Sequence, residues 1–286
     1  MKVLVTGVGG QLGHDVVKEL VRRGMETVGT DSSRMDVTDG ERVARVMEEE
    51  KPDAVIHCAA YTAVDAAEDN EMLCRKVNVD GTRNLATACK RQGCKMIYIS
   101  TDYVFDGTGE RPWEPGDVCH PISVYGCSKY EGELAVQELL EKYFIVRVTW
   151  TFGVNGKNFV KTMLRLARDH ETLRVVNDQF GSPTYTADLA VLLADMVSTD
   201  KYGIYHAASE GICSWYEFAC AIFKESGLSV QVLPVTTAEY GARAARPANS
   251  RLSKEKLVEN GFGKLPSWQD GLERYLEEIQ TVSDQE

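Results

Sequence analysis

The chain has 286 residues, of which 43% are hydrophobic and 26% are charged, and its formal net charge is -11 at pH 7. This length suits one large domain or two modest ones and is ample to bury a core. The negative charge argues against a nucleic-acid partner, and no apolar run approaches the roughly 20 residues that a membrane helix requires. Because an apolar strand pattern opens the sequence, we expect no signal peptide.

The cysteines indicate the compartment. All eight are scattered along the chain, without a Cys-x-x-Cys pair and without histidines at zinc-like spacing. We therefore expect reduced thiols, a cytoplasmic location and no set of metal-ligating residues.

In the first half of the chain, short apolar runs alternate with amphipathic helical patterns, which is typical of βα units and a parallel sheet. Strands are expected at residues 3–6, 26–30, 54–57, 95–100 and 144–148. Helices are expected at 11–23, 41–50, 66–92 and 124–142. Residues 105–121 contain glycines and prolines and are predicted to form a loop over the site. Beyond residue 150 the alternation is less regular, with helices expected at 159–168, 187–197, 215–225 and 266–279.

This order of elements predicts an α/β fold with a doubly wound, Rossmann-like parallel sheet and a smaller C-terminal lobe. Residues 1–149 are assigned to dinucleotide binding. Residues 150–286 are assigned mainly to a substrate-binding lobe, and some of their segments are expected to return to the first domain.

A glycine-rich turn follows the first strand. Gly7, Gly10 and Gly13 stand in the pattern Thr-Gly-x-x-Gly-x-x-Gly between the expected strand and its helix. Glycines in this setting permit a tight turn and let the backbone approach a pyrophosphate at the helix N-terminus. The turn predicts a dinucleotide site, with Gln11 and Leu12 among its contacts.

The end of the second strand bears on the choice of dinucleotide. Asp31 lies 18 residues beyond Gly13, where a carboxylate can accept hydrogen bonds from the adenosine ribose. An acid here favours NADH, because the 2′-phosphate of NADPH would meet like charge. However, Ser32, Ser33 and Arg34 follow at once and could hold that phosphate. The sequence therefore leaves NADH and NADPH both open.

A tyrosine and a lysine lie four residues apart in the helix expected at 124–142. Tyr125 and Lys129 therefore share one face of the helix. A nearby ammonium favours phenolate, so we expect Lys129 to lower the pKa of Tyr125. A phenol tuned in this way can give a proton to a substrate oxygen. With a dinucleotide turn in the same chain, the pair indicates carbonyl reduction by hydride transfer.

Two further strand ends carry candidates. Ala59, Ala60 and Tyr61 follow the third strand, where small residues would let the backbone lie against a ribose or a nicotinamide, although close packing explains the alanines equally well. Thr101 ends the fourth strand, at the edge of the sheet where open α/β folds bind ligands. Its hydroxyl could share a developing oxyanion with the tyrosine.

These residues carry a resemblance that runs nearly end to end. The chain resembles the extended short-chain dehydrogenase/reductases, and within them the dTDP-4-dehydrorhamnose reductases. The superfamily is marked in part by GQLG at 10–13, HCAAYTAVD at 57–65, STDYVFDG at 100–107 and YGCSK at 125–129. More specific to the reductase branch are NFVK at 158–161, DQFGSPT at 178–184, SWYEF at 214–218 and RPANS at 246–250.

The resemblance implies a catalytic set and an activity. Tyr125 would be the acid, Lys129 would lower its pKa and contact the cofactor ribose, and Thr101 would orient the carbonyl. NADPH or NADH would deliver hydride to C4 of dTDP-4-dehydro-6-deoxy-L-mannose, a nucleotide-sugar substrate, giving dTDP-L-rhamnose. The expected cofactor contacts are Gly7, Gly10, Gln11, Leu12, Asp31, Asp36, Val37, Ala59, Ala60, Tyr61, Asn78, Tyr125 and Lys129.

The substrate side is also implied. The sugar end would be shaped by Asp102, Tyr103, Val104 and Phe105. Trp150 matches the substrate-side tryptophan of the family, and Thr101 would contact the substrate as well as take part in catalysis. Arg246 is a candidate for the substrate diphosphate, because guanidinium binds phosphate bidentately; solvation at the surface explains it equally well.

Two features leave the substrate and the assembly open. Phe152 stands where the family usually has tyrosine, which puts the exact substrate in doubt but not the hydride chemistry. Some family members are dimers bridged by Mg²⁺, and Asp15 and Asp188 fall at positions resembling the bridging acids. Both are equally explained as carboxylates near helix starts. A monomer and a homodimer both fit.

Other functions compete with this interpretation. Related nucleotide-sugar dehydratases carry Thr-Asp-Glu after the fourth strand and use the glutamate as a base. This chain has Thr101, Asp102 and Tyr103 there and so lacks the glutamate. An epimerase sharing the Tyr/Lys pair is harder to exclude. A non-catalytic regulator resembling the β subunit of methionine adenosyltransferase is the alternative from another class.

Overall fold

The computed structural model describes residues 1–283, and its centre is a six-stranded sheet with every strand pair parallel. The strand order is β2-β1-β3-β4-β5-β10. The strands are β1 (Lys2–Thr6), β2 (Glu26–Thr30), β3 (Ala54–His57), β4 (Lys95–Thr101), β5 (Tyr143–Val148) and β10 (Gly203–Ala207). The predicted doubly wound α/β fold is confirmed.

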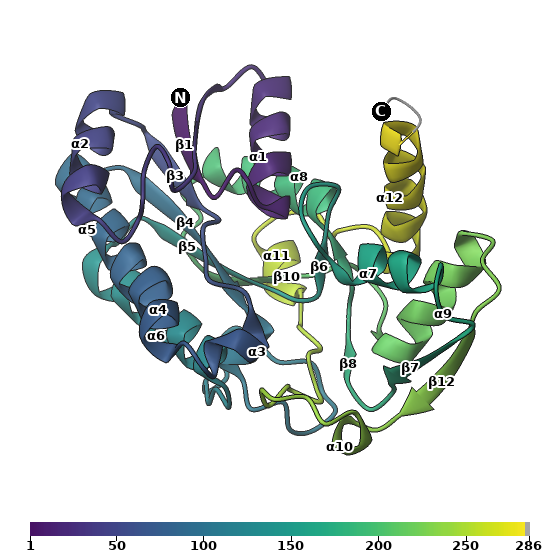
Figure 1. Ribbon diagram of the computed structural model, residues 1–286. Coiled ribbons are helices and arrows are strands. Elements are labelled where there is room, and N and C mark those ends of the chain that lie inside the picture. The colour runs from purple at the N-terminus through teal and green to yellow at the C-terminus, as the bar shows by residue number, and fades with distance from the viewer. Residues whose placement is uncertain (284–286) are drawn as a thin grey trace.

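Helices cover both faces of the sheet (Figure 1). On one face, α1 (Gln11–Arg22) packs against α8 (Thr186–Val197), and their apolar side chains, such as Leu20 and Leu193, form a core with the strands. On the other face lie α2 (Gly40–Glu50), α5 (Gly81–Gln92) and α6 (Val124–Leu139). Because both faces are buried, the strands are continuous apolar runs, which is why sequence analysis found them.

The order in which successive strands are added to the sheet reverses at β1. From β1 the chain crosses to β2 at one edge, and then returns to β3 on the other side of β1. The loops that leave the carboxyl ends of β1 and β3 therefore diverge, and a crevice opens between them. The glycine-rich turn and the segment after His57 are placed at this crevice by topology alone.

The single helix predicted at 66–92 is interrupted. The structure has α3 (Val64–Ala67), α4 (Glu71–Arg75), a π-turn η1 (Lys76–Asp80) and then α5. Asn70 leaves helical geometry, with φ -127° and ψ 43°, and its side-chain amide donates to the carbonyl of Ala66. Asparagine competes with the helix backbone in this way, which explains the break. The π-turn carries Asn78, and such turns are frequent at functional sites.

A second lobe follows β5 (Figure 1). Its strands, which sequence analysis did not predict, are β6 (Thr151–Phe152), β7 (Thr172–Val176), β8 (Phe180–Gly181), β9 (Thr184–Tyr185), β11 (Cys213–Ser214) and β12 (Gln231–Val235). Its helices are α7 (Phe159–Leu166), α9 (Trp215–Glu225), α10 (Thr237–Tyr240) and α12 (Trp268–Ser283). An aromatic core that includes Phe152, Phe218 and Tyr275 holds these elements together.

Part of the second half of the chain lies on the main sheet. β10 pairs with β5 in parallel register from Gly203 to Ala207, and the short helix α11 (Glu255–Glu259) packs on β10. α8 packs against α1. Among residues 1–283, no helix is both long enough and apolar enough to cross a membrane.

A buried ion pair joins α6 to the two strands beneath it. Glu133 on α6 accepts two hydrogen bonds from the guanidinium of Arg147 on β5, at 2.8 and 2.7 Å, and its side chain is fully buried. Ser100 on β4 donates to the same carboxylate at 2.5 Å. Arg147 also donates to the carbonyl of Pro115. The pair therefore fixes α6 relative to β4, β5 and the loop at 105–121.

We expect Glu133→Gln to lower the free energy of unfolding by about 3–5 kcal/mol, because it leaves the buried guanidinium of Arg147 without a counter-charge. Urea-induced unfolding measures the change. Glu138→Gln on the same helix is the matched control, since Glu138 and its partner Arg83 are exposed, and it should change stability little. Equal effects of the two substitutions would contradict the role given to the buried pair.

Candidate active site

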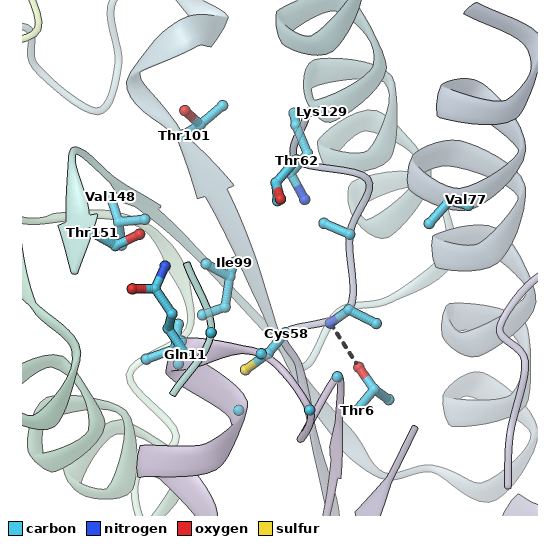
Figure 2. Close-up of a pocket in the computed structure, with 18 of the residues that line it drawn as sticks. Thr6, Gln11, Cys58, Thr62, Val77, Ile99, Thr101, Lys129, Val148 and Thr151 are labelled. Carbon is cyan, nitrogen blue, oxygen red and sulfur yellow. Dashed lines mark hydrogen bonds between the residues drawn. The ribbon is translucent and has the colours of Figure 1, made fainter. Parts of the chain in front are cut away.

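A cavity of about 930 Å³ lies at the carboxyl ends of the strands, between the sheet and the second lobe. Figure 2 shows side chains from separate elements around it, including Thr6, Gln11, Thr62, Thr101 and Lys129. The predicted site residues that line it are Gly7, Gly10, Gln11, Leu12, Asp31, Asp36, Val37, Ala59, Ala60, Thr101, Asp102, Tyr103, Tyr125, Lys129 and Trp150. Predicted residues from six separate parts of the chain thus face one space.

The glycine turn after β1 has no room for side chains at two positions. Gly7 has φ +71°, and a Cβ there would lie 2.7 Å from the backbone nitrogen of Ala59. A Cβ on Gly13 would lie 2.4 Å from the carbonyl oxygen of Gly7. Only glycine permits this approach between the turn, α1 and the segment after β3. The free N-terminus of α1 and the bare turn fit the pyrophosphate of a dinucleotide.

The second lobe is hydrogen-bonded to this turn. The side-chain oxygen of Gln11 accepts from the backbone nitrogen of Gly153 at 2.8 Å and from the amide of Asn158 at 3.0 Å. Asn155 donates to the carbonyl oxygen of Gly9 at 3.0 Å. These contacts set the distance between the dinucleotide turn and the wall formed by the second lobe. Sequence analysis did not assign a role to either asparagine.

Tyr125 and Lys129 lie one turn apart on α6, which begins after Ser123, whose hydroxyl accepts from the Gly126 nitrogen. A Cβ on Gly126 would lie 2.3 Å from the carbonyl oxygen of Tyr103, so glycine lets the first turn of α6 press against the segment after β4. The Nζ of Lys129 lies 4.0 Å from the centroid of the Tyr98 ring. Tyr125 and Lys129 therefore face the cavity from a helix that packs closely against the segment after β4.

The pKa of Tyr125 differs from the expectation. Burial, with a further contribution from the charge of Asp102, raises the pKa of the Tyr125 phenol instead of lowering it. Burial also lowers the pKa of Lys129 to about 7, against the opposing charge of Glu133. Desolvation disfavours whichever form is charged, so it moves the two groups in opposite directions. The phenol therefore keeps its proton at neutral pH, which is the form that a proton donor needs.

The end of β4 brings two more polar groups to the phenol. The hydroxyl of Thr101 donates to Asp102 at 3.1 Å and accepts from the backbone nitrogen of Tyr103 at 3.2 Å. Burial raises the pKa of Asp102 to about 6. The ring of Tyr103 stands edge-on to that of Tyr125, with centroids 5.5 Å apart. Both phenols thus border the same end of the cavity.

Asn78 and Tyr61, predicted as cofactor contacts, do not line the cavity, but Asn78 joins Tyr61 to the helix that carries Tyr125. The side chain of Asn78 accepts from the backbone nitrogen of Tyr61 at 2.7 Å and donates to its carbonyl at 3.1 Å. It also donates to the hydroxyl of Ser128 at 2.9 Å, and Ser128 donates to the carbonyl of Tyr125 at 2.8 Å. The predicted supporting role of Asn78 remains a proposal that this geometry favours.

The opposite end of the cavity is formed after β2. Asp31 accepts from the backbone nitrogen and hydroxyl of Ser33 and from the backbone nitrogen of Arg34, and these bonds lower its pKa. The guanidinium of Arg34 pairs with Glu50. Asp36 accepts two hydrogen bonds from Thr38. A carboxylate and a nearby guanidinium are both present, so this end suits either adenosine ribose or its 2′-phosphate.

Trp150 forms the wall of the second lobe. It is held at φ +48° and stacks on Trp215, with ring centroids 3.7 Å apart and planes inclined by 16°. A Cβ on Gly181 would lie 2.8 Å from the indole, so close packing fixes the ring. Trp215 also lines the cavity. The sequence of residues 214–218 predicts no role for Trp215, because stacking of rings that are distant in the chain has no local signal.

Three predicted substrate contacts lie elsewhere. Val104 and Phe105 are fully buried in a small cluster with Leu252, and Phe105 stacks on Trp113 at 4.5 Å, because the turn after Asp102 points these side chains inward. Arg246 does not line the cavity, and its guanidinium forms two hydrogen bonds to Asp65. Its charge is thereby neutralised by a carboxylate rather than presented to a diphosphate.

The residues that raised doubts about substrate and metal also have protein partners. Phe152 is buried and stacks on Tyr185 in the core of the second lobe, away from the cavity. Asp15 accepts from the hydroxyl of Thr186, and Asp188 accepts two hydrogen bonds from Arg274. Within residues 1–283 no cluster of three or more His, Cys, Asp or Glu side chains could hold a metal ion.

Comparison with known proteins gives close relatives over the whole chain. A family model described as the RmlD substrate binding domain matches residues 1–281. The chain is 44% identical to the dTDP-4-dehydrorhamnose reductase of Aggregatibacter actinomycetemcomitans, covering 95% of this chain and 97% of that protein. It is 42% identical to the spore coat polysaccharide biosynthesis protein SpsK of Bacillus subtilis, covering 99% of both.

Solved structures agree. The crystal structure of a dTDP-4-dehydrorhamnose reductase from Bacillus anthracis in complex with NADP superposes with a TM-score of 0.95 at 46% identity, covering 97% of this chain and 99% of that one. A UDP-glucose 4-epimerase from Thermus thermophilus in complex with NAD gives a TM-score of 0.84 at 23% identity, covering 98% of this chain and 99% of that one. This second likeness concerns the fold alone.

The buried lysine predicts a pH-dependent stability. Because the pKa of Lys129 is about 7 instead of the usual 10.5, the folded protein holds fewer protons at this group than the unfolded chain between these pH values. The group therefore makes the free energy of unfolding rise with pH across that window, and its full cost is present below about pH 7.

We expect Lys129→Met to stabilise the protein at pH 6, on the order of a few kcal/mol, with the gain shrinking as the pH rises towards 10. Urea-induced unfolding at several pH values measures it. Lys142→Met, at an exposed lysine just beyond α6, is the control. A gain that does not depend on pH would contradict the burial of the charge.

Proposed function

The chain belongs to the RmlD substrate binding domain family, and on this premise we propose that it is an NAD(P)H-dependent dTDP-4-dehydrorhamnose reductase. It reduces the C4 carbonyl of dTDP-4-dehydro-6-deoxy-L-mannose to the alcohol of dTDP-L-rhamnose. The single observation that carries the proposal is that Tyr125, Lys129 and Thr101 line the same cavity as the glycine turn.

The residues divide the work of the reaction. A bound reduced nicotinamide supplies the hydride to C4. Tyr125 gives its phenolic proton to the carbonyl oxygen, so that hydride and proton together complete the alcohol. Thr101 holds the carbonyl beside the phenol, and Lys129 holds the cofactor ribose. The glycine turn and the segment at Ala59 and Ala60 position the dinucleotide.

The substrate occupies the side of the cavity formed by Asp102, Tyr103 and the Trp150–Trp215 stack. Arg246 is hydrogen-bonded to Asp65 and does not line this cavity. Tyr103 occupies the position at which the related dehydratases, with Thr-Asp-Glu, carry their basic glutamate, and this difference favours reduction over dehydration. The epimerase likeness rests on the fold, whereas the reductases from Bacillus anthracis and Aggregatibacter actinomycetemcomitans match at 46% and 44% identity.

The conditions of the reaction follow from the same residues. The reductant is NADPH or NADH, since Asp31 can bind a ribose hydroxyl and Arg34 lies three residues further along the chain. The eight cysteines are free thiols, which suits the cytoplasm. The enzyme acts as a monomer or a homodimer, on a nucleotide-sugar substrate and without a nucleic-acid partner.

A direct assay tests the activity. We expect the purified protein, mixed with dTDP-4-dehydro-6-deoxy-L-mannose and NADPH or NADH, to oxidise the cofactor with loss of nicotinamide absorbance. An epimerase would give no net oxidation, and a regulatory protein would bind the cofactor without turnover. Either of these results would reject the proposal.

The acid can be tested separately. Tyr125→Phe removes the proton but little volume, so it should slow the reaction by about 10² to 10⁴-fold with cofactor affinity nearly unchanged. Single-turnover rates and cofactor titration separate the two effects. Tyr143→Phe, at a tyrosine on β5 that does not line the cavity, is the control. Rates near wild type in Tyr125→Phe would show that another group donates the proton.

A further inference from the structure

His57, at the end of β3, lies directly under the cofactor side of the cavity and takes no part in the steps above. Its side chain is 1% exposed, and both ring nitrogens face threonine hydroxyls. Nδ1 lies 2.8 Å from the Oγ1 of Thr6, at the end of β1, and Nε2 lies 3.2 Å from the Oγ1 of Thr82 on α5. The imidazole therefore bridges the first strand and a helix of the opposite layer.

The hydrogen-bond directions follow from the partners. Burial, together with the charge of Lys129, lowers the pKa of His57 to about 3, so the ring is neutral and carries one N–H. The hydroxyl of Thr82 gives its hydrogen to the carbonyl of Asn78 at 2.7 Å, so it can only accept from Nε2. Nδ1 is then unprotonated and accepts from Thr6. The Thr6 oxygen, in turn, accepts from the backbone nitrogen of Ala59 at 3.1 Å.

These bonds form a chain, the His57 hydrogen-bond chain, which runs from the backbone nitrogen of Ala59 through Thr6, His57 and Thr82 to Asn78. One end of it lies in the wall of the cavity, where Figure 2 shows the hydrogen bond between Thr6 and the backbone. Ala59 lines the cavity and leaves no room for a Cβ on Gly7. The His57 hydrogen-bond chain thus orients the peptide group at Ala59, which contacts the glycine turn. A shift of Ala59 would move the surface on which the dinucleotide lies.

The other end reaches the catalytic helix. Asn78, whose carbonyl accepts from Thr82, uses its side chain to hold the backbone of Tyr61 and the hydroxyl of Ser128. Ser128 in turn donates to the carbonyl of Tyr125. A continuous path therefore runs from the cofactor surface to the residue that gives the proton. Every hydrogen bond in it has a single possible direction once Thr82 is fixed.

We propose that His57 is a positioning residue, which holds the cofactor surface at Ala59 and the catalytic turn of α6 at a fixed separation. The inference rests on the proposed reductase function. A neutral imidazole suits this place because its two nitrogens are a rigid acceptor and donor that point in different directions. Hydride transfer is sensitive to such spacing, since misplacement by about 1 Å can cost on the order of a hundredfold in rate.

The test compares His57→Leu, which removes both bonds, with His57→Asn, which keeps a side-chain acceptor and donor. We expect His57→Leu to weaken NADPH binding severalfold in a fluorescence titration without substrate, and to lower kcat by about 10 to 100-fold. The primary kinetic isotope effect with 4-deuterated NADPH should rise, because hydride transfer becomes slower than the other steps. His57→Asn should recover part of both losses.

Thr82→Val provides a second variant in case His57→Leu does not fold. It interrupts the His57 hydrogen-bond chain at a residue that does not line the cavity, and should change NADPH binding and the isotope effect in the same direction as His57→Leu. Tyr205→Phe is the control, because it also removes a hydrogen bond from the sheet, the partly buried bond to the carbonyl of Lys201, which does not belong to the His57 hydrogen-bond chain. It should lower thermal stability and leave the kinetics unchanged.

Wild-type NADPH affinity and isotope effect in folded His57→Leu and Thr82→Val would overturn the inference. Equal kinetic losses in Tyr205→Phe would also overturn it, by assigning the effect to stability. The binding titration keeps the two proposals apart: failure of the wild-type protein to reduce the sugar would reject the reductase function, whereas the loss of NADPH affinity would still test His57.

Discussion

The buried pair of Glu133 and Arg147 is the constraint on which the catalytic geometry depends. Glu133 lies one turn beyond Lys129, Arg147 lies three residues before Trp150, and the Ser100 that donates to the pair immediately precedes Thr101. Helix α6 carries Tyr125 and Lys129, β4 ends at Thr101, and Trp150 follows β5, so the pair holds together the three elements that position these side chains. A buried ion pair is stable only in a narrow geometry, because the cost of desolvation must be offset by well-aligned hydrogen bonds. The position of the catalytic residues is therefore well defined even though they come from separate parts of the chain.

Burial away from water also sets the protonation states of the side chains that line the cavity. Burial raises the pKa of Tyr125, raises that of Asp102 to about 6 and lowers that of Lys129 to about 7. A neutral phenol and a lysine close to its neutral form are what a low dielectric favours. The expectation that an ammonium lowers the tyrosine pKa considered the charge but not the burial, which is the larger effect here. For reduction the outcome is suitable, because a protonated phenol is the donor that the developing alkoxide needs.

Sequence patterns predicted the long elements well, since strands buried on both faces and helices with a periodic apolar face have a strong local signal. They failed where the signal is short or non-local. Two-residue strands such as Thr151–Phe152 have no period to detect, and Asn70 breaks a helix through its own side chain. β10 completes the sheet from the second half of the chain through pairing with β5. The site was predicted best where a motif requires a backbone shape, as at Gly7, and worst where a side chain merely follows a motif, as at Phe105.

The sequence by itself determined the doubly wound fold, the glycine turn and the placing of Tyr125 and Lys129 one turn apart on a helix, because each depends on residues close together in the chain. Only the tertiary structure decided which neighbouring side chains face the cavity. It turned Phe105 and Phe152 into cores, paired Arg246 with Asp65 and stacked Trp215 on Trp150. It also gave His57 its single tautomer. These outcomes depend on burial and on partners up to 181 positions away in the chain, and no local pattern of residues contains that information.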